Sequence, residues 1–170
     1  MDLDLVPVTG PLTGPTLADL TAVYASNPGY HRLSGDFPDP EHVTPDQVAS
    51  ALGEELENPD AEVLLLRDRA RRPAGVACLL HRHPDPGDPY PWIGLLMIHG
   101  DHHGRGLGRA AAGLVEERLR TAGRAGVRLA VLENNPTAWA FWTALGYREI
   151  DRRRDRAGDR PCSVLHKDLR

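Results

Sequence analysis

Residues 102–109 read His-His-Gly-Arg-Gly-Leu-Gly-Arg and run directly into the sequence AAAGLVEERLR, residues 110–120. Alanine and leucine at helical spacing predict a helix for the second part, whereas glycine is a poor residue at which to begin one. The apolar run at 92–99 that precedes the glycines is typical of a strand. A strand, a glycine-rich turn and a helix in this order predict an anion site, because the first N–H groups of a helix have no acceptor within it.

The spacing of the glycines excludes two common phosphate-binding loops. A P-loop ends in Gly-Lys-Ser or Gly-Lys-Thr, and no such sequence follows here. A dinucleotide-binding turn has the spacing G-x-G-x-x-G after the first strand, whereas Gly104, Gly106 and Gly108 follow the pattern G-x-G-x-G late in the chain. The loop therefore indicates a pyrophosphate other than that of ATP or NAD.

The rest of the chain predicts a mixed α/β domain. Three apolar runs in its middle, separated by short connections, are typical of consecutive antiparallel strands. Thr44 is expected to cap a helix that begins at Pro45, after a loop over residues 27–45. Strands are predicted at 3–9, 61–68, 71–83, 90–99 and 127–133, helices at 15–26, 45–58, 106–123 and 135–146, and a final hairpin at 147–169.

Composition limits the number of domains and the kinds of partner. With 170 residues, of which 41% are apolar, the chain is expected to form a single domain over residues 1–170. A net charge of -4 argues against nucleic-acid binding, because duplex-binding proteins usually present a basic surface to the phosphates. The N-terminal sequence is unlike a signal peptide and no apolar run is long enough to span a membrane, so a cytoplasmic protein without a membrane partner is expected.

Neither the cysteines nor the histidines predict a metal site. The two cysteines lie in apolar sequence, and we expect both to be buried as small hydrophobic residues. His81 and His83 have a spacing that can bind zinc on a strand, but no cysteine joins them, and His102 and His103 belong to the glycine loop. We therefore expect no bound metal.

Two motifs together resemble the GNAT N-acetyltransferase family. HGRGLG, residues 103–108, is similar to the family's pyrophosphate motif Gln/Arg-x-x-Gly-x-Gly/Ala, with histidine in the first place. ENNPTAWAFWTALGYRE, residues 133–149, is similar to its motif N-x-x-A-x-x-F-Y-x-x-x-G-F. The resemblance implies an α/β (α+β) fold with a mixed, mostly antiparallel twisted sheet of about six to seven strands and about four helices, splayed between strands four and five.

The resemblance also implies acetyl-CoA as the donor and suggests how it is held. The fourth strand would offer its backbone at 96–98 to the pantetheine arm, and the loop at 103–109 would surround the pyrophosphate. Arg105 or Arg109 would pair with a phosphate, and Asn135 would hydrogen-bond the cofactor arm. The complete set, with two aromatic residues expected beside the thioester, is Leu96, Met97, Ile98, His103, Gly104, Arg105, Gly106, Leu107, Gly108, Arg109, Asn135, Phe141 and Trp142.

The catalytic groups are harder to predict. Family members often use a tyrosine to protonate the leaving thiolate where this chain has Trp142, and an indole N–H cannot release a proton in the relevant pH range. Tyr90 and Tyr30 are alternative donors, or no acid is needed, because a thiol pKa of about 8.5 makes the thiolate a tolerable leaving group. Glu133 and His99 are candidate bases, with a helix cap and a polar strand end as their structural alternatives.

The implied acceptor is the primary amine of a small molecule or an amino-acid-like compound, which would attack the thioester directly. Between Leu33 and Leu66 there are many acidic residues and no Lys or Arg, which indicates either an acidic wall for a cationic amine or a solvated helix face. A non-catalytic acyl-CoA-binding sensor and a protein N-acetyltransferase remain as alternatives. The final hairpin, with RRRDR at 152–156, offers an edge for a homodimer.

Overall fold

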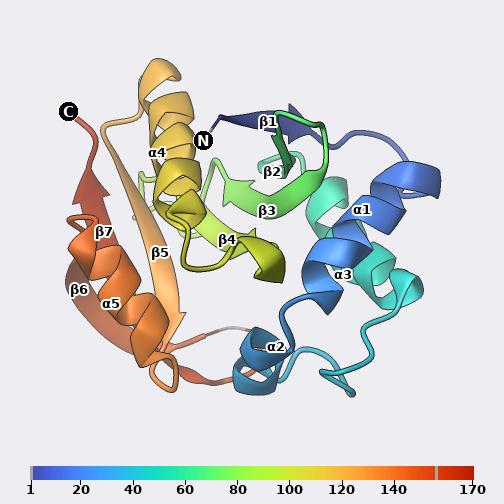
Figure 1. The fold of residues 1–170 in the computed structure, drawn as a ribbon. Coiled ribbons are helices and arrows are strands. Elements are labelled where there is room, and N and C mark those ends of the chain that lie inside the picture. Colours follow the sequence, from blue (N-terminus) through green and yellow to red (C-terminus); the bar gives the residue numbers. More distant parts are fainter. Residues whose placement is uncertain (1, 156) are drawn as a thin grey trace.

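The computed structural model describes residues 2–155 and 157–170, which form one seven-stranded sheet with helices on both faces (Figure 1). The strands are β1 (Leu3–Pro7), β2 (Ala61–Asp68), β3 (Pro73–Leu80), β4 (Trp92–Ile98), β5 (Gly126–Leu132), β6 (Arg148–Arg154) and β7 (Pro161–Asp168). The helices are α1 (Gly14–Ala25), α2 (Pro28–Ser34), α3 (Pro45–Glu57), α4 (Leu107–Thr121) and α5 (Pro136–Ala144), with a short 3-10 helix η1 (Gly100–His102) after β4.

The sheet has the predicted mixed and mostly antiparallel arrangement. Its strand order is β1-β2-β3-β4-β5-β7-β6, and β4 with β5 is its parallel pair. These two strands pair through Trp92 with Arg128 and Ile93 with Leu129, at the start of β4 and the middle of β5. Beyond these residues the strands separate, which confirms the predicted splay between strands four and five.

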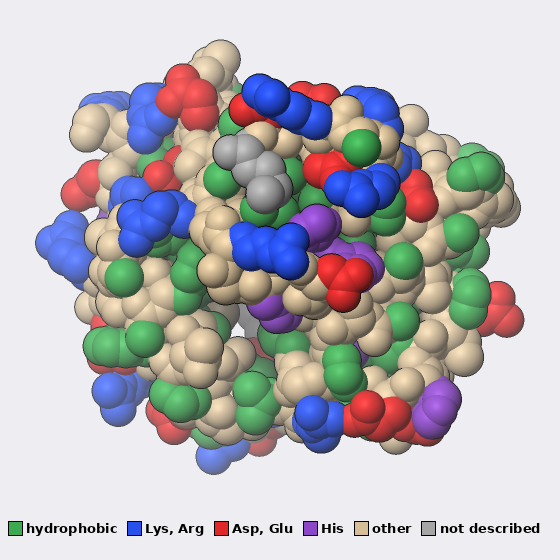
Figure 2. All heavy atoms as spheres, viewed as in Figure 1, with side chains coloured by type: hydrophobic (Ala, Val, Ile, Leu, Met, Phe, Trp, Pro, Cys, Tyr) green, Lys and Arg blue, Asp and Glu red, His purple; other side chains and the backbone are tan. Residues whose placement is uncertain are grey.

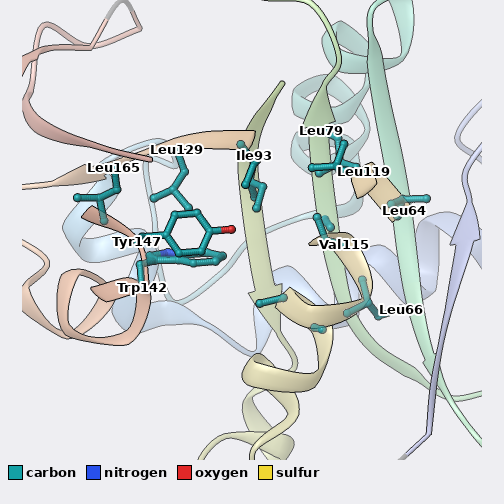
Figure 3. Close-up of a cluster of buried hydrophobic side chains, with 14 of the residues drawn as sticks. Leu64, Leu66, Leu79, Ile93, Val115, Leu119, Leu129, Trp142, Tyr147 and Leu165 are labelled. Carbon is teal, nitrogen blue, oxygen red and sulfur yellow. The ribbon is translucent and has the colours of Figure 1, made fainter. Parts of the chain in front are cut away.

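Alternating side chains build one hydrophobic core on each face of the sheet. In β2, Leu64 and Leu66 belong to the core under α4 and α5, whereas Val63 and Leu65 belong to the core under α1 and α3. Figure 3 shows part of the first core, in which Val115 and Leu119 of α4 lie near leucines of β2 and β3. The two cores hold β4 between them, so the position of the splay is fixed from both sides.

Local capping signals account for where the helices begin. The side chain of Thr44 accepts a hydrogen bond from the Gln47 N–H, and the Gln47 side chain accepts one from the Thr44 N–H, so the predicted cap of α3 is confirmed. Asn135 caps α5 in a related way, by accepting a hydrogen bond from the Ala138 N–H at 3.1 Å, and Pro136 occupies the first turn.

Helix α2 lies inside the segment predicted to be a loop, and it brings the number of α-helices among the described residues to five rather than about four. Asn27 precedes it, Pro28 occupies its first turn, and Gly35 ends it in the left-handed conformation with a φ of 71°. Asn-Pro and a later glycine can mark the start and end of a helix. The segment between them is short and lacks apolar periodicity, so the sequence did not predict a helix there. The loop prediction was therefore wrong for residues 28–34.

The remaining expectations about the chain have mixed outcomes. Cys78 and Cys162 are both free and buried, as predicted, and burial raises the pKa of the Cys78 thiol to about 12. The final hairpin is confirmed as β6 and β7, and β6 lies at the edge of the sheet. Arg156, part of the RRRDR sequence, lies outside the described residues, and the homodimer stays a prediction. None of the helices in the described chain has the length and apolar composition needed to cross a bilayer.

Candidate active site

A cavity of about 710 Å³ opens where β4 and β5 separate. It is lined by β4 and β5, by the start of α4, by α5 and by α2, so it extends from one face of the sheet to the other. On the face drawn in Figure 2, histidine and arginine side chains gather beside a hollow in the surface. Residues from five helices and strands thus surround one cavity.

The backbone of β4 is open to this cavity. After Ile93, β4 has no register partner in β5, so its backbone groups that point toward β5 face the cavity instead. The pairing with β3 also shifts at this point, because Cys78 is opposite Leu95 and Leu79 is opposite Ile93, which leaves Gly94 as the extra residue of a bulge. A strand edge with unpaired N–H groups can donate hydrogen bonds to a bound ligand.

The glycine loop between β4 and α4 forms one end of the cavity. Gly104 and Gly106 adopt φ values of 74° and 79°, a left-handed conformation that other residues adopt only with strain. The first hydrogen bond of α4 runs from the Ala110 N–H to the Gly106 carbonyl at 3.1 Å. The preceding N–H groups at 106–109 therefore have no acceptor within the helix and are available to an anion.

Gly108 has a different role from the other two glycines. A Cβ atom at this position would lie 3.2 Å from Cε2 of Phe141, so any other residue here would require the ring from α5 to shift away from the start of α4. Phe141 in turn packs edge-to-face against Trp142, with ring centroids 5.0 Å apart. The glycine loop and the aromatic motif, predicted from separate parts of the sequence, are thus in direct contact.

Two side chains hold the end of β4 beside the loop. Asn27 Nδ2 donates to the Ile98 carbonyl at 3.0 Å, and His103 Nε2 is 2.9 Å from the same oxygen. A carbonyl oxygen has two lone pairs, and these two contacts occupy both of them. The backbone of Ile98, predicted to bind the pantetheine arm, therefore has no free carbonyl. Antiparallel pairing directs alternate residues of β4 toward β3, so the Met97 backbone pairs with Val76 and the Leu96 backbone faces the cavity.

The structure brings almost all of the predicted donor-binding residues to this cavity. Arg105 is the exception, because it does not line the cavity, whereas Arg109 does. The lining includes Leu96, Met97, Ile98, His103, Gly104, Gly106, Leu107, Gly108, Arg109, Asn135, Phe141 and Trp142. These residues could be proposed from the sequence because they fall in two short stretches, 96–109 and 135–142.

The three residues predicted to act in catalysis lie outside the cavity. Glu133 lines a separate cavity of about 330 Å³ together with Trp139 and Arg152. Tyr90 packs its ring edge-to-face against His166 at 4.7 Å. His99 directly follows β4 and accepts a hydrogen bond from the Asp101 N–H at 3.2 Å, which agrees with its structural alternative as a polar strand end.

Tyr30 is the tyrosine that the structure brings to the cavity. It projects from α2 and packs against the core beneath α1 and α3, on the opposite side of the sheet from Trp142. Burial raises the pKa of its hydroxyl, and the negative charge of Asp36 raises it further. Tyr30 is therefore protonated at neutral pH. The sequence offered it only as one of two alternatives, because the helix that presents it was not predicted.

Hydrogen bonds connect α2 to the segments that follow β5 and precede β7. Asn134 Nδ2, in the connection between β5 and α5, donates to the Leu33 carbonyl at 2.9 Å. Arg160, before β7, donates to the Ser34 carbonyl and pairs with Asp36 at 3.1 Å. Together with the contact of Asn27 at the end of β4, these bonds make α2 a bridge from β4 to the β5 side.

The acidic segment does not form a wall of this cavity. None of its Asp or Glu residues is among the described residues that line the cavity. Several are paired with arginine or histidine elsewhere: Asp36 with Arg160 at 3.1 Å, and Glu62 with His81 at 2.9 Å. In the described part of the chain no group of three or more potential metal ligands comes together, and the absence of a bound metal stays a prediction.

Comparisons with known proteins match this geometry. The model of the acetyltransferase (GNAT) family matches residues 27–147. An acetyltransferase from Thermus thermophilus is 29% identical, with a TM-score of 0.76 over 99% of this chain and 97% of that chain. A spermidine N-acetyltransferase from Vibrio cholerae, solved with CoA and spermine, is 12% identical, with a TM-score of 0.70 over 98% of this chain and 95% of that chain.

A third structure has the same fold at low identity. The ribosomal-protein-S18-alanine N-acetyltransferase from Escherichia coli is 17% identical, with a TM-score of 0.64 over 99% of this chain and 94% of that chain. The similarity to this enzyme and to the Vibrio cholerae enzyme shows the fold alone. A search of curated proteins found no match.

Proposed function

Because this chain belongs to the GNAT acetyltransferase family, a family that uses acetyl-CoA as its donor, we propose that its acceptor is the primary amine of a small molecule or an amino-acid-like compound. The observation that carries the proposal is the cavity between β4 and β5, which reaches from the glycine loop to α2. It offers space for an extended donor on one side and for a second, small molecule on the other.

The residues around the cavity fit the donor. The free N–H groups at the start of α4 suit a pyrophosphate, and Arg109 adds a positive charge at that end. The open backbone of β4 at Leu96 suits the amide groups of a pantetheine arm. Phe141 and Trp142 supply an apolar wall opposite this strand. When bound, acetyl-CoA supplies an activated acetyl group as a thioester.

The reaction requires the amine nitrogen to form a bond with the carbonyl carbon of the thioester while the carbon–sulfur bond breaks. The ammonium gives up one proton to become the attacking amine, the nitrogen loses a second as the amide forms, and the departing thiolate gains one. Unpaired backbone N–H groups of β4 near the bulge at Gly94 would hydrogen-bond the carbonyl oxygen as its negative charge develops. Water can accept the proton from the amine, and the proposal assigns no base to Glu133 or His99, because neither lines the cavity.

Tyr30 is the proposed proton donor to the thiolate. It lines the cavity, and its hydroxyl is protonated at neutral pH. Trp142 occupies the place of the usual tyrosine and cannot release a proton. Tyr90, the other tyrosine considered from the sequence, is not among the lining residues.

The proposed function is tested by the release of free CoA thiol from acetyl-CoA in the presence of a panel of primary amines. Amine-dependent release, with the acetylated amine identified by mass spectrometry, supports the proposal. A protein that binds acetyl-CoA by calorimetry and releases no thiol with any amine contradicts it and favours a sensor module. Acetylation of protein amino groups alone would favour a protein N-acetyltransferase.

A further inference from the structure

We infer that the acceptor is a monoamine with an apolar body, rather than a diamine or polyamine. This inference rests on the proposed function and narrows its substrate class. It concerns the part of the cavity wall formed by α2, which lies across the sheet from Phe141 and Trp142.

The α2 side of the cavity is lined by neutral side chains. Asn27, Tyr30 and Leu33 line it at α2, and Leu95 and Met97 line it from β4. Leu33 is 38% exposed, which makes it one of the most exposed large apolar side chains of the described chain. An apolar ligand that covers Leu33 would remove this surface from water.

Every charged or titratable side chain in the described lining carries either positive or no charge. These side chains are Tyr30, His102, His103 and Arg109, and the last three belong to the glycine loop and the start of α4. The described lining contains no Asp or Glu. A second ammonium on the acceptor would therefore lose water without gaining a carboxylate partner from the lining.

The two carboxylates beside the end of α2 are paired with an arginine. Asp36, just beyond α2, and Asp155, in the turn of the final hairpin, both pair with Arg160. The Arg160 side chain is 27% exposed and also donates to the Ser34 carbonyl, so it holds both carboxylates against the end of α2. Glu133 belongs to the separate cavity beside Trp139. None of these three carboxylates lines the cavity.

A matched pair of acceptors tests the inference. Hexylamine and hexamethylenediamine have the same chain length and differ only in the second amine, which is charged at neutral pH. We expect kcat/KM, measured by CoA thiol release, to be about tenfold or more higher for hexylamine. An equal or higher value for the diamine overturns the inference and leaves the proposed function intact. No turnover with any primary amine, although acetyl-CoA binds, overturns the proposed function and the inference with it.

A pair of variants at Leu33 provides the second arm. Leu33→Glu places a carboxylate on the α2 wall, and we expect it to shift the ratio of the two kcat/KM values toward the diamine by about threefold or more. Leu33→Gln has nearly the same size without the charge, and we expect the ratio to stay at its original value. Thermal unfolding and acetyl-CoA calorimetry establish that both variants are folded. A ratio that shifts equally in both variants, or in neither, contradicts the neutral-wall account.

Discussion

The carbonyl of Ile98 offers a direct test of how the end of β4 is held. Asn27 donates to this oxygen at 3.0 Å and His103 lies 2.9 Å from it, so two side chains that are distant in the sequence share one acceptor. We predict that Asn27→Ala and His103→Ala are each mild, and that the double variant is less stable than the sum of the two effects predicts.

The size of each change in the free energy of unfolding depends on which carbonyl groups lose their last hydrogen-bond donor. In Asn27→Ala, the Ile98 carbonyl keeps His103, and the Val23 carbonyl, which Asn27 also contacts, keeps the Ser26 hydroxyl at 2.7 Å. Each single change should therefore cost about 1 kcal/mol of the free energy of unfolding, the usual net value of a hydrogen bond. The double variant leaves the Ile98 carbonyl with neither side-chain donor, and water in the cavity offsets part of that loss. We expect a coupling of about 1 kcal/mol.

Urea unfolding followed by tryptophan fluorescence measures these free energies, and the chain contains three tryptophans as probes. The control cycle pairs Asn27→Ala with His102→Ala, because His102 lines the same cavity but has no hydrogen bond to Ile98 in the described structure. The control cycle should be additive within about 0.3 kcal/mol. Additivity in the Asn27 and His103 cycle would refute the shared-acceptor reasoning.

Three further predictions concern the loop, the proton donor and acid stability. Gly106→Ala should cost about 1–2 kcal/mol of stability and weaken acetyl-CoA binding in calorimetry, because the φ of 79° strains any residue with a Cβ; unchanged values would contradict this role. Tyr30→Phe should lower kcat by about tenfold or more while Tyr90→Phe leaves it near the original value; the reverse order would exclude Tyr30 as the donor. Burial raises the pKa of Asp88, but hydrogen bonds from the Tyr90 N–H, Trp92 and Arg128 outweigh it and hold the pKa below the ordinary value of 3.8. The ionised Asp88 side chain stabilises the fold above pH 3.8, and this contribution is lost as the pH falls through the lower pKa of the folded state. Thermal unfolding of Asp88→Asn should therefore show a weaker loss of stability in acid than the parent chain. An identical acid profile would contradict this.

The parts of the site that were predictable depend on short-range patterns. The glycine loop and the start of α4 lie within a few residues of sequence, so backbone propensity indicates them directly. Asn135 was predicted to bind the cofactor arm, and its side-chain oxygen caps α5. The splay followed from the family resemblance, and the structure expresses it as a parallel pair that ends at Ile93 and Leu129. The role of Gly108 was not predictable, because its partner Phe141 is distant in the sequence.

The catalytic predictions depended on long-range packing that sequence patterns do not display. Glu133 is the first residue of the second motif as quoted, yet it lines a separate cavity beside Trp139. Tyr30 reaches the cavity between β4 and β5 because α2 forms and is held by hydrogen bonds from Asn134 and Arg160. The contact with Arg160 joins residues 126 positions apart, and no local signal could have paired them. The start and end of α2, in contrast, were visible as Asn-Pro and glycine.

A crystal structure of the protein with acetyl-CoA tests the central claim most directly. The account predicts the pyrophosphate at the N–H groups of residues 106–109, the pantetheine arm along β4, and the thioester between the bulge at Gly94 and Trp142, with the α2 side left open to the acceptor. A donor bound in the cavity beside Glu133, or with its pyrophosphate away from the start of α4, would contradict it.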